Sequence, residues 1–325
     1  MNMSIPKLCI VGAGILSSFR IYPYIGAAGA KIVGVCDLDA EKARKNAELF
    51  GGEVFTNMET MLDAVAPDGV IICIGPEAHS ELALKVIVRG IPVYTEKPPA
   101  VDAASTLAVA RAARVADVLC MTAFKKRYSN AARRAKEWIG GKEILTLSMD
   151  RASGKYSNAN PRNDLLLDFG IHGIDLMGFL MGDARDVMAY AKGLEAYAVC
   201  VKFASGAVGT LSLSDGRAFD IPTEEIELTA AGGNFMSIHN SSSWKIGENG
   251  RCTEWREPPT FVSTGDSGYE TGHLAELEYF VRAVAGGAKT APSEIYESYK
   301  TMVLYEAIKK SAATETPVRA VYEAL

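Results

Sequence analysis

The stretch Leu8-Cys9-Ile10-Val11-Gly12-Ala13-Gly14 joins a short apolar run directly to two glycines that one residue separates. Such a run predicts a buried strand, and glycines at its end let a phosphate approach the backbone where the next helix begins. The third glycine of a Gly-x-Gly-x-x-Gly pattern is replaced by Ser17, which is small enough for helix and strand to pack closely. The stretch favours a dinucleotide-binding fold, although such a glycine turn also occurs in unrelated α/β proteins.

The residue after the second predicted strand strengthens this interpretation. Asp37 follows Ile32–Cys36, where an acidic side chain can accept hydrogen bonds from the hydroxyls of an adenosine ribose. Its carboxylate repels a 2′-phosphate, and Leu38 comes next in place of an arginine that would bind one. We therefore expect NAD as the cofactor, with NADP as the weaker alternative.

Short β-branched runs alternate with helical patterns from Lys7 to Ala123, which is typical of βαβ units and a parallel sheet. Asp102 is expected to cap one of these helices. The alternation predicts an N-terminal Rossmann domain over residues 1–123. Its strands are expected at 8–11, 32–36, 70–74, 93–95 and 118–122, and two of its helices at 39–50 and 102–115.

The pattern changes after Ala123. A helix containing Trp138 is followed by a strand, a polar loop and an apolar helix that ends near Gly182, and then by strand-like stretches separated by turn residues. Two helical patterns, about 269–285 and 293–313, close the chain. We expect a second α/β domain over residues 124–325. Its strands are expected at 143–151, 187–192, 198–203, 207–214, 226–230 and 235–239.

Composition excludes several classes of function. The chain has 325 residues and a net charge of −5, and its basic residues are scattered, so we expect no nucleic-acid partner. The six cysteines are far apart without a CxxC pair, so we expect no metal site. No apolar run approaches the roughly 20 residues that span a bilayer, and no secretory signal is recognisable. We therefore expect no membrane partner and a cytoplasmic protein.

Three motifs resemble the glucose-fructose oxidoreductase and inositol dehydrogenase (Gfo/Idh/MocA) family. They are Val70–His79, Glu96-Lys97-Pro98 and Asp168–Asp175, in the family's order. The resemblance implies a Rossmann domain followed by an α/β domain with an open, mainly antiparallel sheet, through which we expect a homodimer or homotetramer. It also implies hydride transfer between nicotinamide and a carbon that bears a hydroxyl or carbonyl group, on a sugar, cyclitol or related polyol.

The resemblance also implies the catalytic residues Lys97, Asp168 and His172. Oxidising an alcohol requires a base near the hydroxyl, and histidine titrates near neutrality. Asp168 precedes His172 by four residues, so both are expected on one helical face, where the carboxylate could orient the imidazole or bind a substrate hydroxyl. Lys97 would hold the reacting oxygen. Plainer interpretations are a helix-surface hydrogen bond for the pair and an exposed lysine paired with Glu96.

Further site residues follow from the same motifs. Arg127 and Asn163 are the expected additional substrate ligands beside Lys97, Asp168 and His172, although loop charges are often simply solvated. His79 is expected to support the cofactor loop, and Lys97-Pro98 is expected to be a cis peptide that aims the lysine inward. The expected cofactor ligands are Gly12, Gly14, Ile15, Asp37, Gly75, Pro76, His79, Glu96 and Lys97.

Two alternatives to a freely exchanging dehydrogenase remain open at this point. One is an oxidoreductase or glycosidase that keeps NAD tightly bound and recycles it within each turnover. The other is a dinucleotide sensor that has the fold without the reaction. A sensor is expected to lack the lysine or the histidine, and Lys97 and His172 are both present.

Overall fold

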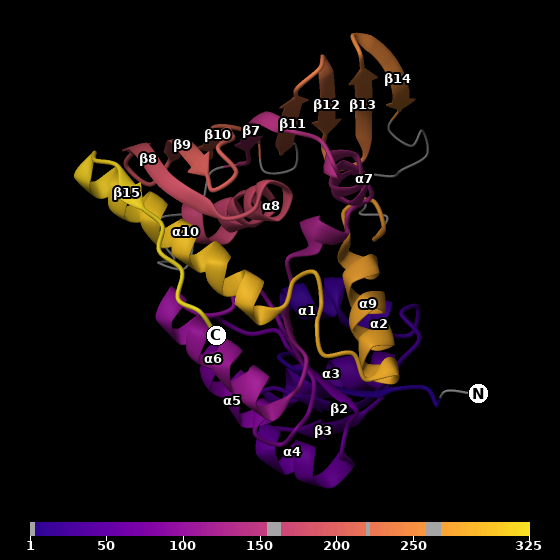
Figure 1. Cartoon of the computed structure of the whole chain (residues 1–325). Coiled ribbons are helices and arrows are strands. Elements are labelled where there is room, and N and C mark those ends of the chain that lie inside the picture. Colours follow the sequence, from indigo (N-terminus) through magenta and orange to yellow (C-terminus); the bar gives the residue numbers. More distant parts are fainter. Residues whose placement is uncertain (1–3, 155–163, 219–221, 258–267) are drawn as a thin grey trace. The chain divides into compact units, whose positions relative to one another are not determined.

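The computed structural model describes residues 4–154, 164–218, 222–257 and 268–325 (Figure 1). The chain forms two compact units: unit 1 comprises residues 1–124, 273–299 and 325, and unit 2 comprises residues 125–272 and 300–324. The first boundary between the two units follows Phe124, one residue beyond the expected boundary after Ala123. Residues 273–299, which we expected in the second domain, belong instead to unit 1.

Unit 1 contains a six-stranded sheet in which every neighbouring pair is parallel. This is the strand order of a Rossmann fold, and it confirms the predicted fold class. In sheet order the strands are β3 (Glu53–Phe55), β2 (Lys31–Cys36), β1 (Lys7–Val11), β4 (Gly69–Ile72), β5 (Val93–Thr95) and β6 (Cys120–Thr122). The helices are α1 (Ile15–Arg20), α2 (Tyr22–Ile25), α3 (Ala40–Phe50), α4 (Met58–Val65), α5 (His79–Ile87), α6 (Ala103–Ala116) and α9 (His273–Gly286).

Local sequence explains where the helices of unit 1 begin, and packing explains why α9 belongs there. The side chain of Asp102, the predicted cap, accepts a hydrogen bond from the Ser105 N–H at 2.7 Å. A Cβ atom on Gly69 of β4 would lie 3.3 Å from the ring of Phe280 in α9. Tyr94 of β5 donates to Glu276 of α9 at 2.9 Å, and both side chains are buried. Helix α9 therefore covers the central strands of the parallel sheet.

Unit 2 contains a nine-stranded sheet that is antiparallel except for the parallel pair β7 and β10. The mixed, mainly antiparallel sheet confirms the predicted class. In sheet order the strands are β14 (Arg251–Arg256), β13 (Ser243–Glu248), β12 (Asn234–His239), β11 (Thr223–Ala230), β7 (Ile144–Ala152), β10 (Val208–Ser214), β9 (Ala196–Phe203), β8 (Ala184–Lys192) and β15 (Val318–Arg319). The helical elements are η1 (Lys125–Tyr128), α7 (Asn130–Ile139), the π-helix η2 (Leu165–Gly170) and α8 (Ile171–Met181), and α10 (Ile295–Thr314) crosses from unit 1 into unit 2.

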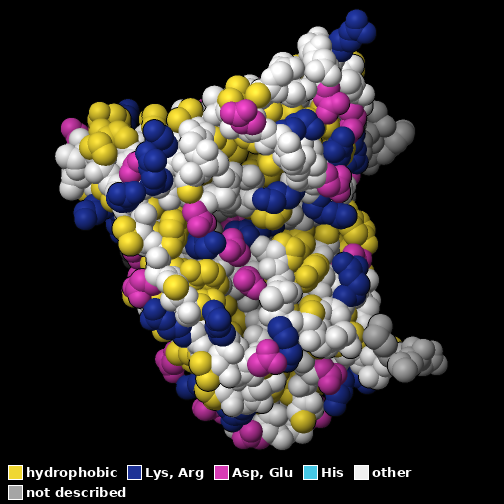
Figure 2. All heavy atoms as spheres, in the orientation of Figure 1, with side chains coloured by type: hydrophobic (Ala, Val, Ile, Leu, Met, Phe, Trp, Pro, Cys, Tyr) yellow, Lys and Arg dark blue, Asp and Glu magenta, His cyan; other side chains and the backbone are white. Residues whose placement is uncertain are grey.

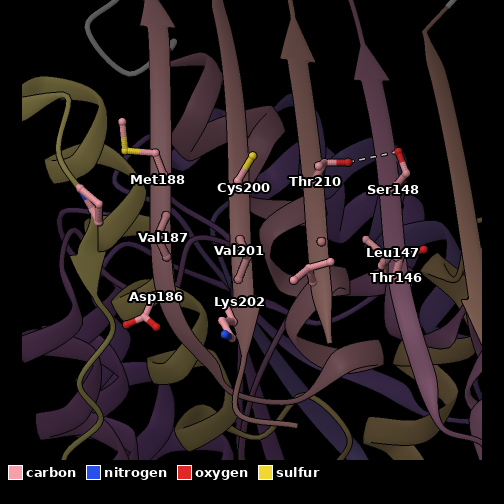
Figure 3. A pocket seen from close by; sticks show the side chains of 13 residues that line it. Thr146, Leu147, Ser148, Asp186, Val187, Met188, Cys200, Val201, Lys202 and Thr210 are labelled. Carbon is pink, nitrogen blue, oxygen red and sulfur yellow. Dashed lines mark hydrogen bonds between the residues drawn. The ribbon is translucent and has the colours of Figure 1, made fainter. Parts of the chain in front are cut away.

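The two faces of this sheet differ in character. Alternate residues such as Leu147 and Met149 of β7 are buried on the face that α8 covers. Their neighbours lie on the opposite, open face, where Ser148 and Thr210 form a hydrogen bond of 3.2 Å between β7 and β10 (Figure 3). This alternation is what a half-covered sheet requires.

The surface carries intermingled charges. On the face shown in Figure 2, basic and acidic side chains alternate without a broad patch of one sign. Among the described helices, none is long and apolar enough to cross a membrane. Within the same described ranges, no group of three or more His, Cys, Asp or Glu residues could hold a metal ion.

Candidate functional site

The glycine turn after β1 has a steric requirement for glycine at Gly12. Its φ of +105° lies in the region that L side chains rarely adopt, and an added Cβ would lie 2.0 Å from the carbonyl oxygen of Cys73. The Gly12 N–H donates to the Cys36 carbonyl at 2.7 Å, and the Tyr22 hydroxyl donates to the Gly12 carbonyl at 3.2 Å. The turn is therefore clamped between the ends of β2 and β4.

Gly14, by contrast, borders open space. A Cβ added there meets no heavy atom within 4 Å, and the backbone has an ordinary extended conformation. Ser17 is fully buried beneath it and donates to the Gly14 carbonyl at 3.1 Å, so the serine does fit where the glycine pattern is interrupted. Ile15, a predicted cofactor ligand, is 82% exposed at the start of α1. No side chain caps the start of α1, and the open space beside it fits a dinucleotide phosphate.

Asp37 holds the same turn from the end of β2. Its Oδ2 accepts the Ala13 N–H at 2.7 Å and its Oδ1 accepts the Asp39 N–H at 2.9 Å. A carboxylate has about four acceptor positions, so both oxygens can still accept from ribose hydroxyls. Leu38 beside it is 94% exposed and brings no positive charge.

The turn between β4 and α5 places Gly75 and Pro76 at the same carboxyl edge of the sheet. The Ala78 and His79 N–H groups donate to the Gly75 and Pro76 carbonyls at 3.3 Å. His79 is fully buried, and its Nδ1 donates to the Pro98 carbonyl at 2.7 Å. Burial lowers the pKa of His79, which keeps the ring neutral at neutral pH. His79 therefore links the start of α5 to the turn that follows β5.

Lys97 leaves the sheet at the end of β5. The Glu96 N–H donates to the Ile72 carbonyl at 2.8 Å, which extends the pairing of β5 with β4 by one residue. Buried Glu96 then accepts the Lys97 N–H at 3.0 Å, and Lys97 itself is half-buried. The Lys97-Pro98 peptide is cis, as predicted from the sequence.

Asp168 and His172 lie on unit 2, in one continuous helical segment made of η2 and α8. Asp164 begins this segment by accepting the Leu166 and Leu167 N–H groups at 2.9 and 3.4 Å. The sequence predicted an α-helix throughout, whereas Asp168 lies in a π-helical turn, a rare element that is frequent at functional sites. Asp168 and His172 are both half-buried.

Two glycines let this segment pack closely on the sheet. A Cβ on Gly170 would lie 2.8 Å from Leu213 of β10, and a Cβ on Gly173 would lie 2.9 Å from Arg151 of β7. These two glycines therefore let the helical segment approach strands β10 and β7 closely. The predicted site thus has one part on unit 1 and one part on unit 2.

Comparison with known families gives one match for each of two long segments of the chain. Residues 7–124 match "Oxidoreductase family, NAD-binding Rossmann fold", and residues 157–320 match "Oxidoreductase family, C-terminal alpha/beta domain". The chain belongs to the Gfo/Idh/MocA oxidoreductase family. The resemblance inferred from three short motifs is confirmed.

Similar members of the Gfo/Idh/MocA family align over nearly the full chain. An inositol 2-dehydrogenase of Rhizobium meliloti is 24% identical, covering 95% of this chain and 97% of its own. A D-apiose dehydrogenase of Rhizobium rhizogenes is 22% identical over 96% of this chain and 97% of its own length. The crystal structure of an oxidoreductase from Agrobacterium radiobacter in complex with NAD+, L-tartaric acid and magnesium has a TM-score of 0.86 at 18% identity, covering 98% of this chain and 99% of that one. At 18% identity, the similarity to this crystal structure shows the fold alone.

The structure does not support Arg127 as a substrate ligand. Its guanidinium is 3% exposed and donates to both carboxylate oxygens of Asp175 at 2.7–3.1 Å. Thr301 donates to the same carboxylate at 2.9 Å. Arg127 is therefore committed to a buried ion pair that holds α8. Asn163, the other expected ligand, lies outside the described residues.

The motifs missed a buried charge cluster beside η2. Arg151 of β7 and Glu224 of β11 are cross-strand partners, and both are almost fully buried. A signal existed: Arg151 is in phase with Leu147 and Met149 on the covered face of β7. A charged residue at a buried position of a strand requires a partner of opposite charge. The two-residue alternation of the strand alone could have identified Arg151 as such a residue.

Proposed function

We propose that this protein is an NAD-dependent oxidoreductase that transfers hydride between nicotinamide and a hydroxyl or carbonyl carbon of a sugar, cyclitol or related polyol. The observation that carries the proposal is the carboxyl edge of unit 1, where the Gly12 turn, Asp37 and Lys97 leave the ends of β1, β2 and β5. Open α/β sheets bind ligands at this edge. Relatives named as inositol and D-apiose dehydrogenases support the substrate class.

The proposed catalytic residues have distinct roles. When bound, NAD supplies the acceptor for hydride. His172 takes the proton from the substrate hydroxyl, because an imidazole ordinarily titrates near neutral pH. The Lys97 ammonium donates a hydrogen bond to the same oxygen and stabilises its negative charge as the proton leaves. Asp168 orients the imidazole or accepts from a second substrate hydroxyl.

We propose NAD rather than NADP on the chemistry around Asp37. Its carboxylate already accepts two backbone N–H groups and stays close to the glycine turn. A 2′-phosphate would bring a second negative charge against it, whereas a ribose diol would donate hydrogen bonds. The exposed neighbour Leu38 offers no compensating charge.

A dehydrogenase screen tests the proposal. Cyclitols, aldoses, amino sugars and sugar acids are offered with NAD and with NADP, and reduced cofactor is followed by absorbance. We expect NAD-linked turnover of at least one polyol, and loss of that turnover in Lys97→Ala and in His172→Ala, with NAD binding retained in His172→Ala. Unchanged turnover in either variant would refute the mechanism. Co-purified stoichiometric NAD(H) without turnover of added NAD would instead favour an enzyme that recycles a tightly bound cofactor.

We also propose that the open face of the nine-stranded sheet joins copies of this chain into a homodimer or homotetramer. This face has a groove of about 430 Å³ across β7, β8, β9 and β10 (Figure 3). The short side chains of Ser148, Thr210 and Cys200 line its middle, and Asp186 and Lys202 lie opposite each other at one end. A two-fold axis could place such opposite charges against each other. Light scattering should give an oligomer that Thr210→Arg dissociates; a monomeric wild type would refute this assignment.

A further inference from the structure

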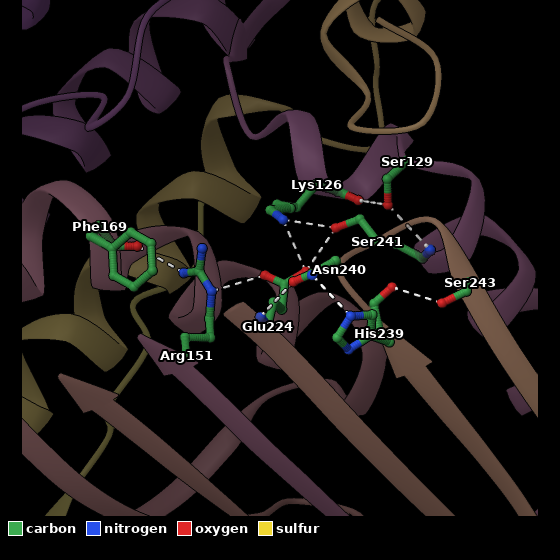
Figure 4. A network of polar contacts seen from close by, with 10 residues as sticks. Lys126, Ser129, Arg151, Phe169, Glu224, His239, Asn240, Ser241 and Ser243 are labelled. Atoms are coloured by element: carbon green, nitrogen blue, oxygen red, sulfur yellow. Dashed lines mark hydrogen bonds and ion pairs between the residues drawn. The ribbon is translucent and has the colours of Figure 1, made fainter. Parts of the chain in front are cut away.

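A buried cluster of charges lies on the covered face of the sheet in unit 2 (Figure 4). Glu224 is at its centre, with Lys126 Nζ 2.9 Å from one carboxylate oxygen and Arg151 Nε 2.9 Å from the other. The Ser241 hydroxyl also donates to Glu224, at 2.7 Å. Glu224 and Arg151 are less than 5% exposed. The cluster joins η1, β7, β11 and the end of β12.

The charges of this cluster depend on one another. Burial alone would raise the pKa of Glu224, but Lys126 and Arg151 lower it to about 2. Glu224 is therefore ionised at neutral pH, and its carboxylate forms a buried ion pair with the Arg151 guanidinium. A buried arginine held in this way can direct its remaining N–H groups at a second target.

That second target is the helical segment that carries the proposed catalytic pair. Arg151 Nη1 donates to the Phe169 carbonyl at 2.8 Å, and the guanidinium lies 4.3 Å from the centroid of the Phe169 ring. Phe169 directly follows Asp168 and precedes His172 by three residues, within the π-helical turn. Gly173, one residue after His172, leaves the room that the Arg151 side chain occupies.

We propose that Arg151 is a positioning residue that fixes Asp168 and His172 by holding the Phe169 carbonyl, with Glu224 as its anchor. This inference rests on the proposed function, in which Asp168 and His172 act on the substrate. Arginine suits this position because its guanidinium forms an ion pair with Glu224 through Nε and donates a hydrogen bond to the Phe169 carbonyl through Nη1. A lysine ammonium is a compact point charge that cannot reproduce both contacts in the same geometry.

The test compares Arg151→Lys and Arg151→Met with a matched control, Arg134→Lys. Arg134 also pairs with a glutamate of unit 2, Glu254, through Nε and Nη2 at 2.6–3.1 Å. The first readout is NMR of the imidazole rings, which needs no substrate. The chain has four histidines, so single His→Asn variants assign every signal. We expect both Arg151 variants to shift the His172 signals and to leave the His79 signals, from unit 1, unchanged. The control Arg134→Lys should shift neither the His172 nor the His79 signals.

The second readout is steady-state kinetics on the substrate found in the screen. We expect Arg151→Lys to lower kcat by roughly 10- to 100-fold, as a small misplacement of catalytic groups does, with a smaller change in KM and unchanged NAD affinity. A purely stabilising role would lower the unfolding temperature and leave kcat of the folded protein unchanged. Should Arg151→Met fail to fold, Arg151→Lys keeps the charge and decides the question.

The two proposals fail in different ways. If the His172 signals of folded Arg151→Lys coincide with those of the wild type, the positioning role is refuted, whatever the enzyme does. If His172→Ala keeps full turnover, the proposed mechanism is refuted, whatever the NMR spectra show.

Discussion

Two glycines of one turn should respond differently to the same substitution. In Gly12→Ala the new Cβ would lie 2.0 Å from the Cys73 carbonyl oxygen, with φ at +105°. The unfavourable backbone conformation costs about 1–2 kcal/mol. Displacing a packed backbone group adds about 1–3 kcal/mol, as overpacking does. Together these terms destabilise unit 1 by roughly 2–5 kcal/mol.

In Gly14→Ala the new methyl group meets no protein atom within 4 Å, and the backbone conformation suits any residue. Stability should therefore be unchanged or higher by up to about 1 kcal/mol, because alanine has less freedom in the unfolded chain. The methyl group would, however, fill the space that we assign to the pyrophosphate. We expect NAD affinity to fall by about tenfold or more, which corresponds to at least ~1.4 kcal/mol.

Differential scanning fluorimetry and NAD titration by calorimetry separate the two effects. For a unit of about 150 residues, each kcal/mol lowers the unfolding temperature by roughly 2–4 °C, so Gly12→Ala should lose about 4–20 °C. Gly14→Ala should unfold at or above the wild-type temperature and bind NAD weakly. Wild-type NAD affinity in Gly14→Ala would refute the phosphate position, and an unchanged unfolding temperature in Gly12→Ala would refute the clamp on Cys73.

Three further changes test other parts of the molecule. Asp37→Ser should weaken NAD binding and bring the dissociation constants for NAD and NADP closer together in paired titrations. An unaltered ratio of the two dissociation constants would count against the role of the carboxylate. Because the pKa of Glu224 lies near 2, below its ordinary 4.5, its ionised form stabilises the fold fully above about pH 4.5 and this stabilisation disappears towards pH 2. The free energy of unfolding of Glu224→Gln should therefore be about 3 kcal/mol below that of the wild type at pH 7, as the pKa shift of Glu224 implies, and this difference should disappear on acidification. Urea titrations at several pH values measure it. A difference that stays constant with pH would contradict the prediction. Asp175→Ala leaves Arg127 buried without its carboxylate and should cost about 3–5 kcal/mol in the same assay, whereas a change below about 1 kcal/mol would mean that water replaces the ion pair.

Elements with a clear apolar pattern were predictable, and elements without one were not. The expected strand at 93–95 is β5 itself, since its apolar run is bounded by turn residues. Strand β3 was missed because it has three residues, two of them exposed, and offers no recognisable period. Strand β13 was also missed, because Gly247 interrupts its alternation of apolar and polar side chains. Helix α9 was predicted as a helix, but its packing in unit 1 could not be predicted, because its partner Tyr94 lies far away in the sequence.

Site residues followed a similar division. The local geometry of the Gly12 turn and the cis Lys97-Pro98 peptide were predictable because each depends on a few neighbouring residues, whereas the cofactor and catalytic roles of these positions stay predictions. Arg127 was misjudged because a run of three basic residues suggests a solvated cluster. Its buried partner Asp175 comes from another element, and the sequence gives no local sign of that contact.

The contact between Arg151 and Phe169 shows why a motif alone does not define this half of the site. The D-x-x-x-H spacing would survive intact in a chain that had lost Arg151, and a motif search would still count Asp168 and His172 as present. Their positions, however, depend on a π-helical turn whose carbonyl is held by a buried arginine on β7, itself anchored by Glu224. The proposed positioning role therefore predicts that relatives which keep the motif but lack this pair hold the turn by other contacts or turn over their substrates more slowly.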